Sequence, residues 1–194
     1  MNNKKLGGTK SMKKIFGVGQ EDMSNIAFSF MAFGFKLRDR FFPVDQFVTT
    51  LGIQPGFTVI DYGCGPGSYL KKTAKIVGRE GKVYAVDIHE MAIDEVKKRI
   101  KKYQLPNVKP VLAMGYSCPL NTRVANVILA LDMFHMIEKP TEFLKELHRL
   151  LKRDGYLIID NGHQSREAAK AKINNTRIWK IESENEKYLQ CRPI

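Results

Sequence analysis

Apolar residues of this chain fall, from residue 57 onward, into short continuous runs separated by longer amphipathic segments. The short runs are rich in β-branched residues and predict strands at 57–62, 82–87, 108–113, 125–131 and 156–160. The segments between them predict helices at 68–77, 91–103 and 142–151. Parallel strands joined through helices need crossover connections, so we expect an α/β fold with a mostly parallel sheet covered on both faces.

The C-terminal residues depart from this alternation. Residues 177–182 and 187–192 flank a polar stretch, Ser183-Glu184-Asn185-Glu186, which predicts an antiparallel hairpin with Trp179 packed inward. Arg153-Asp154-Gly155 predicts a turn into the fifth strand. Little sequence separates that strand from the hairpin, so we expect no large lid there.

The segment before the first strand is aromatic, since six of the eleven phenylalanines lie within 22–42. Ile26, Phe30, Phe33 and Leu37 recur at helical spacing and predict one helix, or two short helices divided near Gly34. A second helix is expected over 43–50, because proline is favoured at the first position of a helix.

Composition fits one globular domain, with 194 residues, 43% hydrophobic and 27% charged. Three scattered cysteines show no zinc spacing or disulfide framework, and we predict no metal site. The longest uncharged run, 23–35, is shorter than the roughly 20 residues of a membrane-spanning helix, and no signal peptide is evident. We therefore expect a cytoplasmic protein without a membrane span, and the sequence leaves its oligomeric state open.

The net charge of +12 raises the question of nucleic acid as a partner. One group of lysines lies within residues 1–20, which are polar and predict a flexible basic tail. A second lies at 97–102, on the expected outer face of a helix. Such lysine-rich faces commonly serve solubility, so nucleic-acid binding stays open without being favoured.

A glycine turn follows the first strand in TVIDYGCGPGSY. Gly63, Gly65 and Gly67 let the backbone curl tightly and approach a ligand, at the sheet edge where ligands of parallel sheets bind. Asp87 ends the second strand about 20 residues later, where a carboxylate can accept hydrogen bonds from both ribose hydroxyls. The spacing therefore predicts a ligand that contains a nucleoside.

Two kinds of nucleoside ligand compete for this turn. A dinucleotide fingerprint needs G-x-G-x-x-G, but Ser68 stands at the last position. Asp61 lies two residues before Gly63, and its carboxylate would repel a pyrophosphate while suiting an ammonium and a sulfonium. The absence of a Gly-Lys-Ser/Thr sequence excludes a Walker-type phosphate loop. The residues favour S-adenosylmethionine.

Four stretches together resemble the class I S-adenosylmethionine-dependent methyltransferases, in their small-molecule, methyltransferase-11-like branch. They are VIDYGCGPGSYL, VYAVDIHEMAI, SCPLNTRVANVILALDMFHMI and ELHRLLKRDGYLIID. The resemblance covers about residues 44–163 and extends toward the end. It implies a Rossmann-like seven-stranded sheet in the order 3-2-1-4-5-7-6, strand seven antiparallel. It also implies a single domain over 21–194, with a helical cap at 21–52 and the Rossmann-like core at 53–194.

The resemblance assigns a set of residues to S-adenosylmethionine. They are Asp61, Gly63, Gly65, Gly67, Asp87, Ile88, Met114, Gly115 and Leu131. The three glycines would lie under the amino-acid half of the cofactor, and Ile88 would lie along the adenine. The sequence departs from the family after strand three, where Met114 stands in place of an acid that often binds the adenine amino group.

The resemblance places residues that face the methyl acceptor in LDMFHMI, after strand four. Asp132 and His135 are three residues apart, so one helical turn can bring them together, with His135 as base and Asp132 orienting it. The alternative is that Asp132 caps the next helix and His135 packs against the sheet. His163, after strand five, lies at the same edge. Cys64 is expected to be a small buried filler.

We expect the aromatic helices at 22–50 to close the site and line it with rings, which favours a small, partly apolar acceptor. The alternative is that these rings only pack on the sheet. An RNA or protein methyltransferase, suggested by the charge, and a non-catalytic cofactor-binding subunit also stay open. The scattered cysteines argue against an arsenite methyltransferase, which would need grouped thiols.

Overall fold

The computed structural model describes residues 23–42 and 44–194. Its seven strands form one sheet in the order β3-β2-β1-β4-β5-β7-β6, with β7 antiparallel to both of its neighbours and the other pairs parallel. The strands are β1 (Thr58–Tyr62), β2 (Lys82–Asp87), β3 (Val108–Leu112), β4 (Ala125–Ala130), β5 (Leu151–Ile159), β6 (Trp179–Glu184) and β7 (Leu189–Pro193). The predicted fold class and strand order are confirmed. The expected tail at 1–20 lies outside the described residues.

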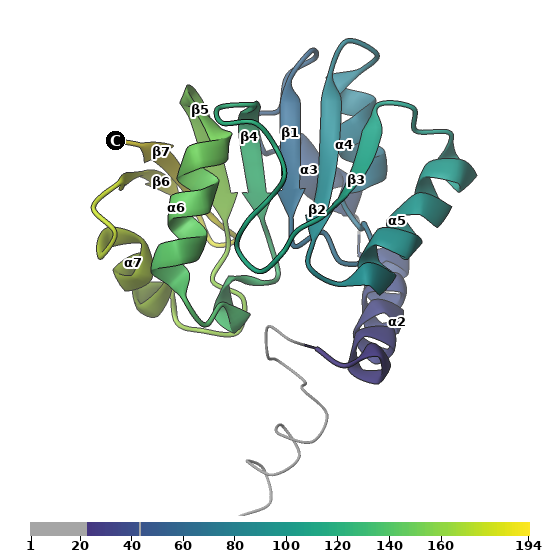
Figure 1. The fold of residues 1–194 in the computed structure, drawn as a ribbon, viewed down its shortest axis with the longest axis horizontal. Helices are drawn as coiled ribbons and strands as arrows, with labels where there is room; N and C mark the ends of the chain where they lie inside the picture. Colours follow the sequence, from purple (N-terminus) through teal and green to yellow (C-terminus); the bar gives the residue numbers. More distant parts are fainter. Residues whose placement is uncertain (1–22, 43) are drawn as a thin grey trace, which may run out of the picture.

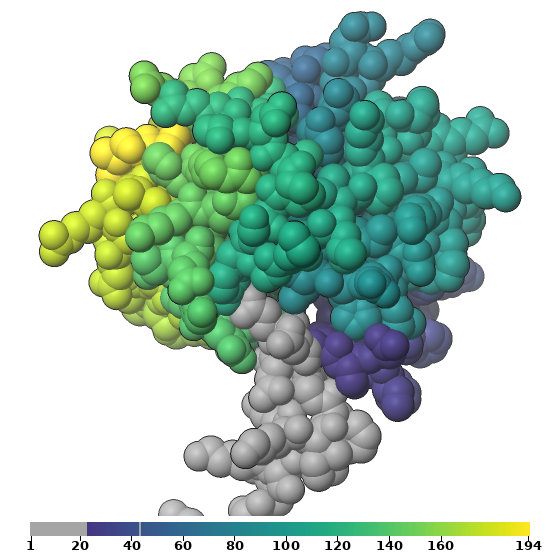
Figure 2. Space-filling view, in the orientation of Figure 1, coloured from purple at the N-terminus to yellow at the C-terminus, as the bar shows by residue number. Residues whose placement is uncertain are grey.

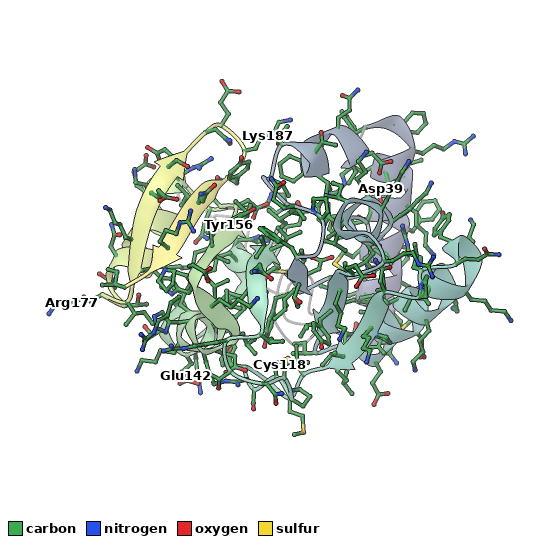
Figure 3. The ribbon with its side chains drawn as sticks, turned by 90° about the horizontal axis from the view of Figure 1, so that it is seen from above. Asp39, Cys118, Glu142, Tyr156, Arg177 and Lys187 are labelled. Carbon is green, nitrogen blue, oxygen red and sulfur yellow. The ribbon has the colours of Figure 1, made fainter. Side chains whose placement is uncertain are left out.

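Helices cover both faces of the sheet (Figure 1). They are α2 (Asn25–Phe41), α3 (Val44–Thr49), α4 (Leu70–Val77), α5 (Glu90–Tyr103), α6 (Pro140–Leu150) and α7 (Arg166–Asn174), with a short 3₁₀ helix η1 (Phe134–Met136). Seen from above, Glu142 of α6 and Asp39 of α2 lie toward opposite sides of the sheet (Figure 3).

Two apolar cores result from the alternation of side chains along the central strands. Ile128 and Leu129 are consecutive residues of β4 and both are fully buried, yet they belong to different cores. Ile128 packs with Phe143 and Leu147 of α6, and Leu129 packs with the α4 face. Successive side chains of a strand point to opposite faces, so a continuous apolar run is the pattern of a strand buried on both sides.

Helix α2 is a single helix, and Gly34 does not divide it. Ser24 caps its first turn by accepting a hydrogen bond from the Ala27 N–H at 3.3 Å. The helix lies beyond the carboxyl ends of the strands and beside α5 (Figures 1 and 2). No helix of residues 23–42 or 44–194 combines the length and the apolar character needed to cross a membrane.

Two features differ from the sequence prediction. The expected turn at 153–155 lies inside β5, which begins at Leu151 and passes a register shift opposite Ala125–Val127. A Cβ at Gly155 would lie 2.8 Å from the Asn126 carbonyl oxygen, so glycine permits this close backbone approach rather than a chain reversal. Helix α7 was not predicted, because only Ala169 and Ile173 of it are buried. Trp179 is buried as predicted, and its ring N–H donates to the Leu144 carbonyl at 3.2 Å.

Candidate functional site

The glycine turn after β1 is held against the end of β2. The N–H groups of Gly63 and Cys64 both donate to the Val86 carbonyl, at 2.8 and 3.0 Å. Gly63 has φ +75° and Gly65 has φ +48°, a region that favours glycine. A Cβ at Gly63 would lie 2.9 Å from Met133 Cγ. Cys64 is buried, and burial raises the pKa of its thiol well above the usual value, so it fits the predicted filler role.

Asp87 closes this turn from the end of β2. Its Oδ2 accepts from the Gly65 N–H at 2.8 Å and its Oδ1 accepts from the His89 N–H at 2.9 Å. The side chain is 8% exposed, and burial raises its pKa despite these hydrogen bonds. An ionised carboxylate has about four acceptor sites, so both oxygens retain capacity toward a ligand.

Asp61 lies in β1 directly under the turn. Its Oδ2 is buried and has no hydrogen-bond partner among the described residues. Burial, with the charges of Asp87 and Asp132 acting in the same direction, raises its pKa to about 7. Asp61 and Asp87, two carboxylates at one glycine turn, make an environment that favours a cation and disfavours a pyrophosphate.

A cavity of about 100 Å³ adjoins the turn. Its walls come from the turn, the ends of β2 and β4, the loop after β3, and α2. The lining residues are Met23, Phe28, Met31, Phe35, Tyr62, Gly63, Gly65, Asp87, Ile88, His89, Gly115, Tyr116, Leu131, Asp132, Met133, Met136, Ile137 and Phe143. Pockets for drug-sized ligands measure roughly 300–1,000 Å³, so this cavity must widen to hold a nucleoside ligand.

Most residues predicted for the cofactor reach this cavity, but not all of them do. Ile88, Gly115 and Leu131 line it with Gly63, Gly65 and Asp87. Met114 is not among the lining residues and is 79% exposed, so its packing on adenine stays a prediction. Asp61 is buried behind the turn and is not among the lining residues. Gly67 also lies off the cavity: a Cβ there would lie 2.7 Å from Leu70 Cδ1, so this glycine lets the turn pack on α4.

Sequence reasoning missed His89 and the face of α2 that closes the cavity. The Phe28 ring stacks on His89 with centroids 4.4 Å apart and an interplanar angle of 18°. His89 also caps α5 by accepting from the Met91 N–H at 3.2 Å. Phe28, Met31 and Phe35 occupy the helix face opposite the predicted Phe30–Phe33 stripe. These three residues also recur at helical spacing, and testing both faces of the helix for this periodicity could have identified them.

Asp132 joins α2 to the sheet. It has φ +62°, and its Oδ2 accepts from the Tyr69 hydroxyl at 2.7 Å and from Arg38 Nη1 at 2.6 Å. The expectation that Asp132 caps the following helix is wrong, because η1 begins after Met133 and has no side-chain cap. Its carboxylate instead binds an arginine that the sequence pattern did not single out.

The Arg38–Asp132 ion pair predicts a measurable local effect. In an Arg38→Ala variant we expect amide hydrogen exchange across α2 to accelerate by about fivefold to tenfold, while β1 and β4 stay protected. This corresponds to roughly 1 kcal/mol, a modest value because the two side chains are 28% and 33% exposed. Exchange measured by mass spectrometry checks it. Lys97→Ala, which breaks a more exposed pair with Asp94, is the control, and unchanged exchange in α2 of Arg38→Ala would show that the pair does not hold the helix.

A second cavity, of about 310 Å³, shares Phe35 and Asp132 with the first. Its other lining residues are His135, Asp160, Asn161, Gly162, His163, Glu186 and Lys187. The rings of His135 and His163 lie 4.7 Å apart, edge to face. The structure thus brings both predicted histidines to one cavity beside the glycine turn.

Two groups of this second cavity have shifted acidities. Burial lowers the pKa of His135, with His163 acting in the same direction and Asp132 opposing it, so the ring is neutral near pH 7. Its Nδ1 is buried and has no partner among the described residues, so this nitrogen is not held by Asp132. Burial raises the pKa of Asp160 to about 6. Within the part of the chain that the structure describes, no group of three or more acidic, histidine or cysteine side chains is placed to hold a metal ion.

Comparison with known proteins gives a consistent family. The family model described as "Methyltransferase domain" matches residues 53–192. A crystal structure of a SAM-dependent methyltransferase from Aquifex aeolicus superposes with a TM-score of 0.72 at 24% identity, covering 81% of this chain and 93% of that one. At that identity the likeness concerns the fold.

Two curated relatives match shorter stretches. The probable cobalt-precorrin-6B C(15)-methyltransferase (decarboxylating) of Saccharolobus solfataricus is 26% identical over 113 residues, 58% of this chain and 56% of that protein. The tRNA (adenine(58)-N(1))-methyltransferase catalytic subunit TRM61 of Yarrowia lipolytica is 40% identical over 63 residues, 32% of this chain and 16% of that protein. The chain spans about half or less of the length of the curated relatives it matches.

Proposed function

Because the chain belongs to the methyltransferase-domain family, we propose that it transfers a methyl group from S-adenosyl-L-methionine to a small, partly apolar acceptor. The observation that carries the proposal is the carboxylate cluster at the glycine turn, in which Asp61 Oδ2 is buried and has no partner in the part of the chain that the structure describes. Such a group suits the ammonium and sulfonium of this cofactor, whereas a dinucleotide would bring a pyrophosphate to it.

The residues that line the first cavity fit the parts of the cofactor. Asp87 would accept hydrogen bonds from the ribose, while Ile88 and the backbone of Gly115 would border the adenine. Gly63 and Gly65 would admit the amino-acid half, near Asp61, and Leu131 would close the floor. When bound, the cofactor supplies a methyl group on a sulfonium, a leaving group that is already activated, so positioning and exclusion of water provide much of the rate.

We place the methyl acceptor in the second cavity, which adjoins the first at Phe35 and Asp132. Nδ1 of His135, which has no partner within residues 23–42 and 44–194, is the candidate base for an acceptor that must lose a proton, since this ring is neutral near pH 7. Asp132 acts as a positioning residue through Arg38 and Tyr69. Turnover should then fall as pH drops through the lowered pKa of His135, and this acid limb should vanish in His135→Gln.

The first test is calorimetric titration of the purified protein with S-adenosylmethionine, with NAD as the control ligand. Binding of S-adenosylmethionine alone supports the proposal, and a following screen of candidate acceptors with methyl-labelled cofactor identifies the reaction. A preference for NAD would contradict the interpretation of Asp61. Failure to bind either ligand would favour a subunit without catalysis.

The second candidate is methylation of RNA. It is supported by the net charge of +12 and by the name of the Yarrowia relative, which matches 32% of this chain. The small-molecule proposal is preferred because α2 lines the cavity with the apolar side chains Phe28, Met31 and Phe35 rather than with basic ones. Tight RNA binding with a steep dependence on salt concentration would reverse this preference.

The domain organisation belongs to the same proposal. The family model begins at residue 53, which agrees with a core at 53–194 preceded by a helical cap at 21–52. The described part of that cap supplies one wall of the first cavity. A cytoplasmic location is supported by the three cysteines, which are buried, unbonded thiols.

A further inference from the structure

The outer face of α2 carries a continuous stripe of exposed apolar side chains. The exposed fractions are 62% for Ile26, 75% for Phe30, 67% for Phe33, 49% for Leu37 and 70% for Phe41. Phe42, which is 66% exposed, extends the stripe. The spacing of three or four residues puts the five helical positions on one side of the helix. The stripe runs for about 22 Å at 1.5 Å per residue. Single exposed apolar residues are ordinary, but a contiguous patch of this kind marks a binding surface.

This stripe is separate from the cavity that the helix covers. Phe28 and Ala32 are buried and Phe35 lines both cavities, and these residues lie on the opposite side of α2. The helix is therefore apolar on two sides, of which one is already packed on the core. The packing of the protein itself explains the inner face and leaves the stripe without a partner among the described residues.

Basic residues border the stripe on one side. Arg40 and Lys36 of α2 line a shallow cleft together with Lys98 and Lys102 of α5. Residues 97–102 of α5 hold five basic residues and no acidic one. Two ion pairs, Lys36–Glu95 at 2.7 Å and Arg99–Asp39 at 3.8 Å, fix the two helices side by side, as Figure 1 shows.

We propose that the stripe on α2 docks on the surface of an anionic lipid membrane, with the basic edge of α2 and α5 against the lipid headgroups. A helix with a bulky apolar face and a neighbouring basic edge has the pattern of an interfacial helix, which lies in the membrane plane. Each lysine or arginine near an anionic surface adds attraction of about 1 kcal/mol, or roughly fivefold in partitioning. The inference does not depend on the proposed activity.

Charge argues against two other occupants of the stripe. A second copy of the chain, paired antiparallel by two-fold symmetry, would bring the same basic edges together, and in any pairing each copy has a net charge of +12. Residues 1–22 contain five lysines against two acidic residues, Glu21 and Asp22, so they would meet the same repulsion, although a weaker one. An anionic bilayer satisfies both the apolar stripe and the basic edge.

Vesicle co-sedimentation tests the proposal on the full chain. We expect binding to vesicles of phosphatidylcholine mixed with phosphatidylglycerol and little binding to phosphatidylcholine alone. The double variant Phe30→Ser/Phe33→Ser should weaken the binding at least about tenfold, since each ring loses its burial in lipid. Arg40→Gln/Lys102→Gln should weaken it by about fivefold for each charge removed.

The matched control is Ile194→Ser, which removes an equally exposed apolar residue (75%) at the C-terminus and should leave vesicle binding unchanged. Thermal unfolding of every variant verifies that it folds. Failure of the wild-type protein to bind anionic vesicles would overturn the proposal, as would binding that is indifferent to the phenylalanine substitutions. Sedimentation velocity showing a dimer that Phe30→Ser/Phe33→Ser dissociates would assign the stripe to self-association instead.

Discussion

Replacing Asp87 by alanine is expected to weaken binding of S-adenosylmethionine by about 10²- to 10⁴-fold. The ribose hydroxyls would donate two hydrogen bonds to this carboxylate, and a hydrogen bond to a charged group contributes about 1.5–3 kcal/mol. Two such bonds give about 3–6 kcal/mol, and each 1.4 kcal/mol corresponds to a tenfold change in affinity. Calorimetric titration measures the change directly.

Asp87 also shapes the site, because it accepts the N–H groups of Gly65 and His89. Asp87→Asn separates the two roles, since an amide oxygen can still accept one of these bonds. We expect it to retain the fold, checked by thermal unfolding, and to bind the cofactor at an affinity between those of the wild type and Asp87→Ala. Asp94→Ala, at an exposed position of α5, is the control. If Asp87→Ala folds and binds the cofactor with wild-type affinity, Asp87 does not bind the ribose.

The sheet could be predicted from the sequence because its signals are local. Runs such as 82–87 have buried residues on both faces of the sheet. The glycines come directly after β1 and Asp87 is the last residue of β2, so each strand places its site residues. β5 and α7 were harder for opposite reasons. β5 continues through Gly155, a glycine that the sequence pattern assigns to a turn but that the structure needs for the close approach to Asn126. Helix α7 buries too few apolar side chains to give a periodic signal.

The orientation of α2 could not be predicted, because both of its faces are apolar. The helix was expected to line the site with aromatic rings, but the positions whose spacing predicted it, Ile26, Phe30, Phe33 and Leu37, are exposed. Which face packs inward depends on partners distant in sequence, such as His89 against Phe28 and Asp132 against Arg38. The same holds for Asp132, whose partners come from residues 63 and 94 positions away.

Asp61→Asn is expected to stabilise the protein without ligand and to weaken its cofactor binding. An acid whose folded-state pKa is raised from 3.8 to about 7 binds its proton more tightly in the folded state than in the unfolded state. Stability therefore falls as pH rises from about 4 to about 7, and the full penalty of a buried, unpaired charge remains above that. The substitution removes this penalty, so the melting temperature should rise by a few degrees above pH 7, at roughly 2–4 °C per kcal/mol.

Affinity should change in the opposite direction, because a cationic ligand prefers Asp61 ionised. In the wild type, affinity should increase with pH up to about 7, and binding below that pH should release a proton. Asp61→Asn should bind about 10- to 100-fold more weakly at pH above 7, the loss of one charge-assisted interaction of about 1.5–3 kcal/mol. The pH dependence should flatten as well.

Asp160→Asn is the matched control for both effects. Asp160 is a half-buried carboxylate just past the end of β5, with a pKa raised to about 6 and one oxygen without a partner among the described residues. Its other oxygen accepts the Asp132 N–H at 2.9 Å, a bond that an asparagine oxygen can still accept. It lines the second cavity and not the first, so its substitution should raise the melting temperature and leave cofactor affinity unchanged. If Asp61→Asn destabilises the protein, or if this variant binds the cofactor as tightly as the wild type, the carboxylate of Asp61 does not serve to bind a cation. Stability and affinity moving in opposite directions at Asp61 alone would mark this carboxylate as a group kept for its ligand, at the expense of the ligand-free fold.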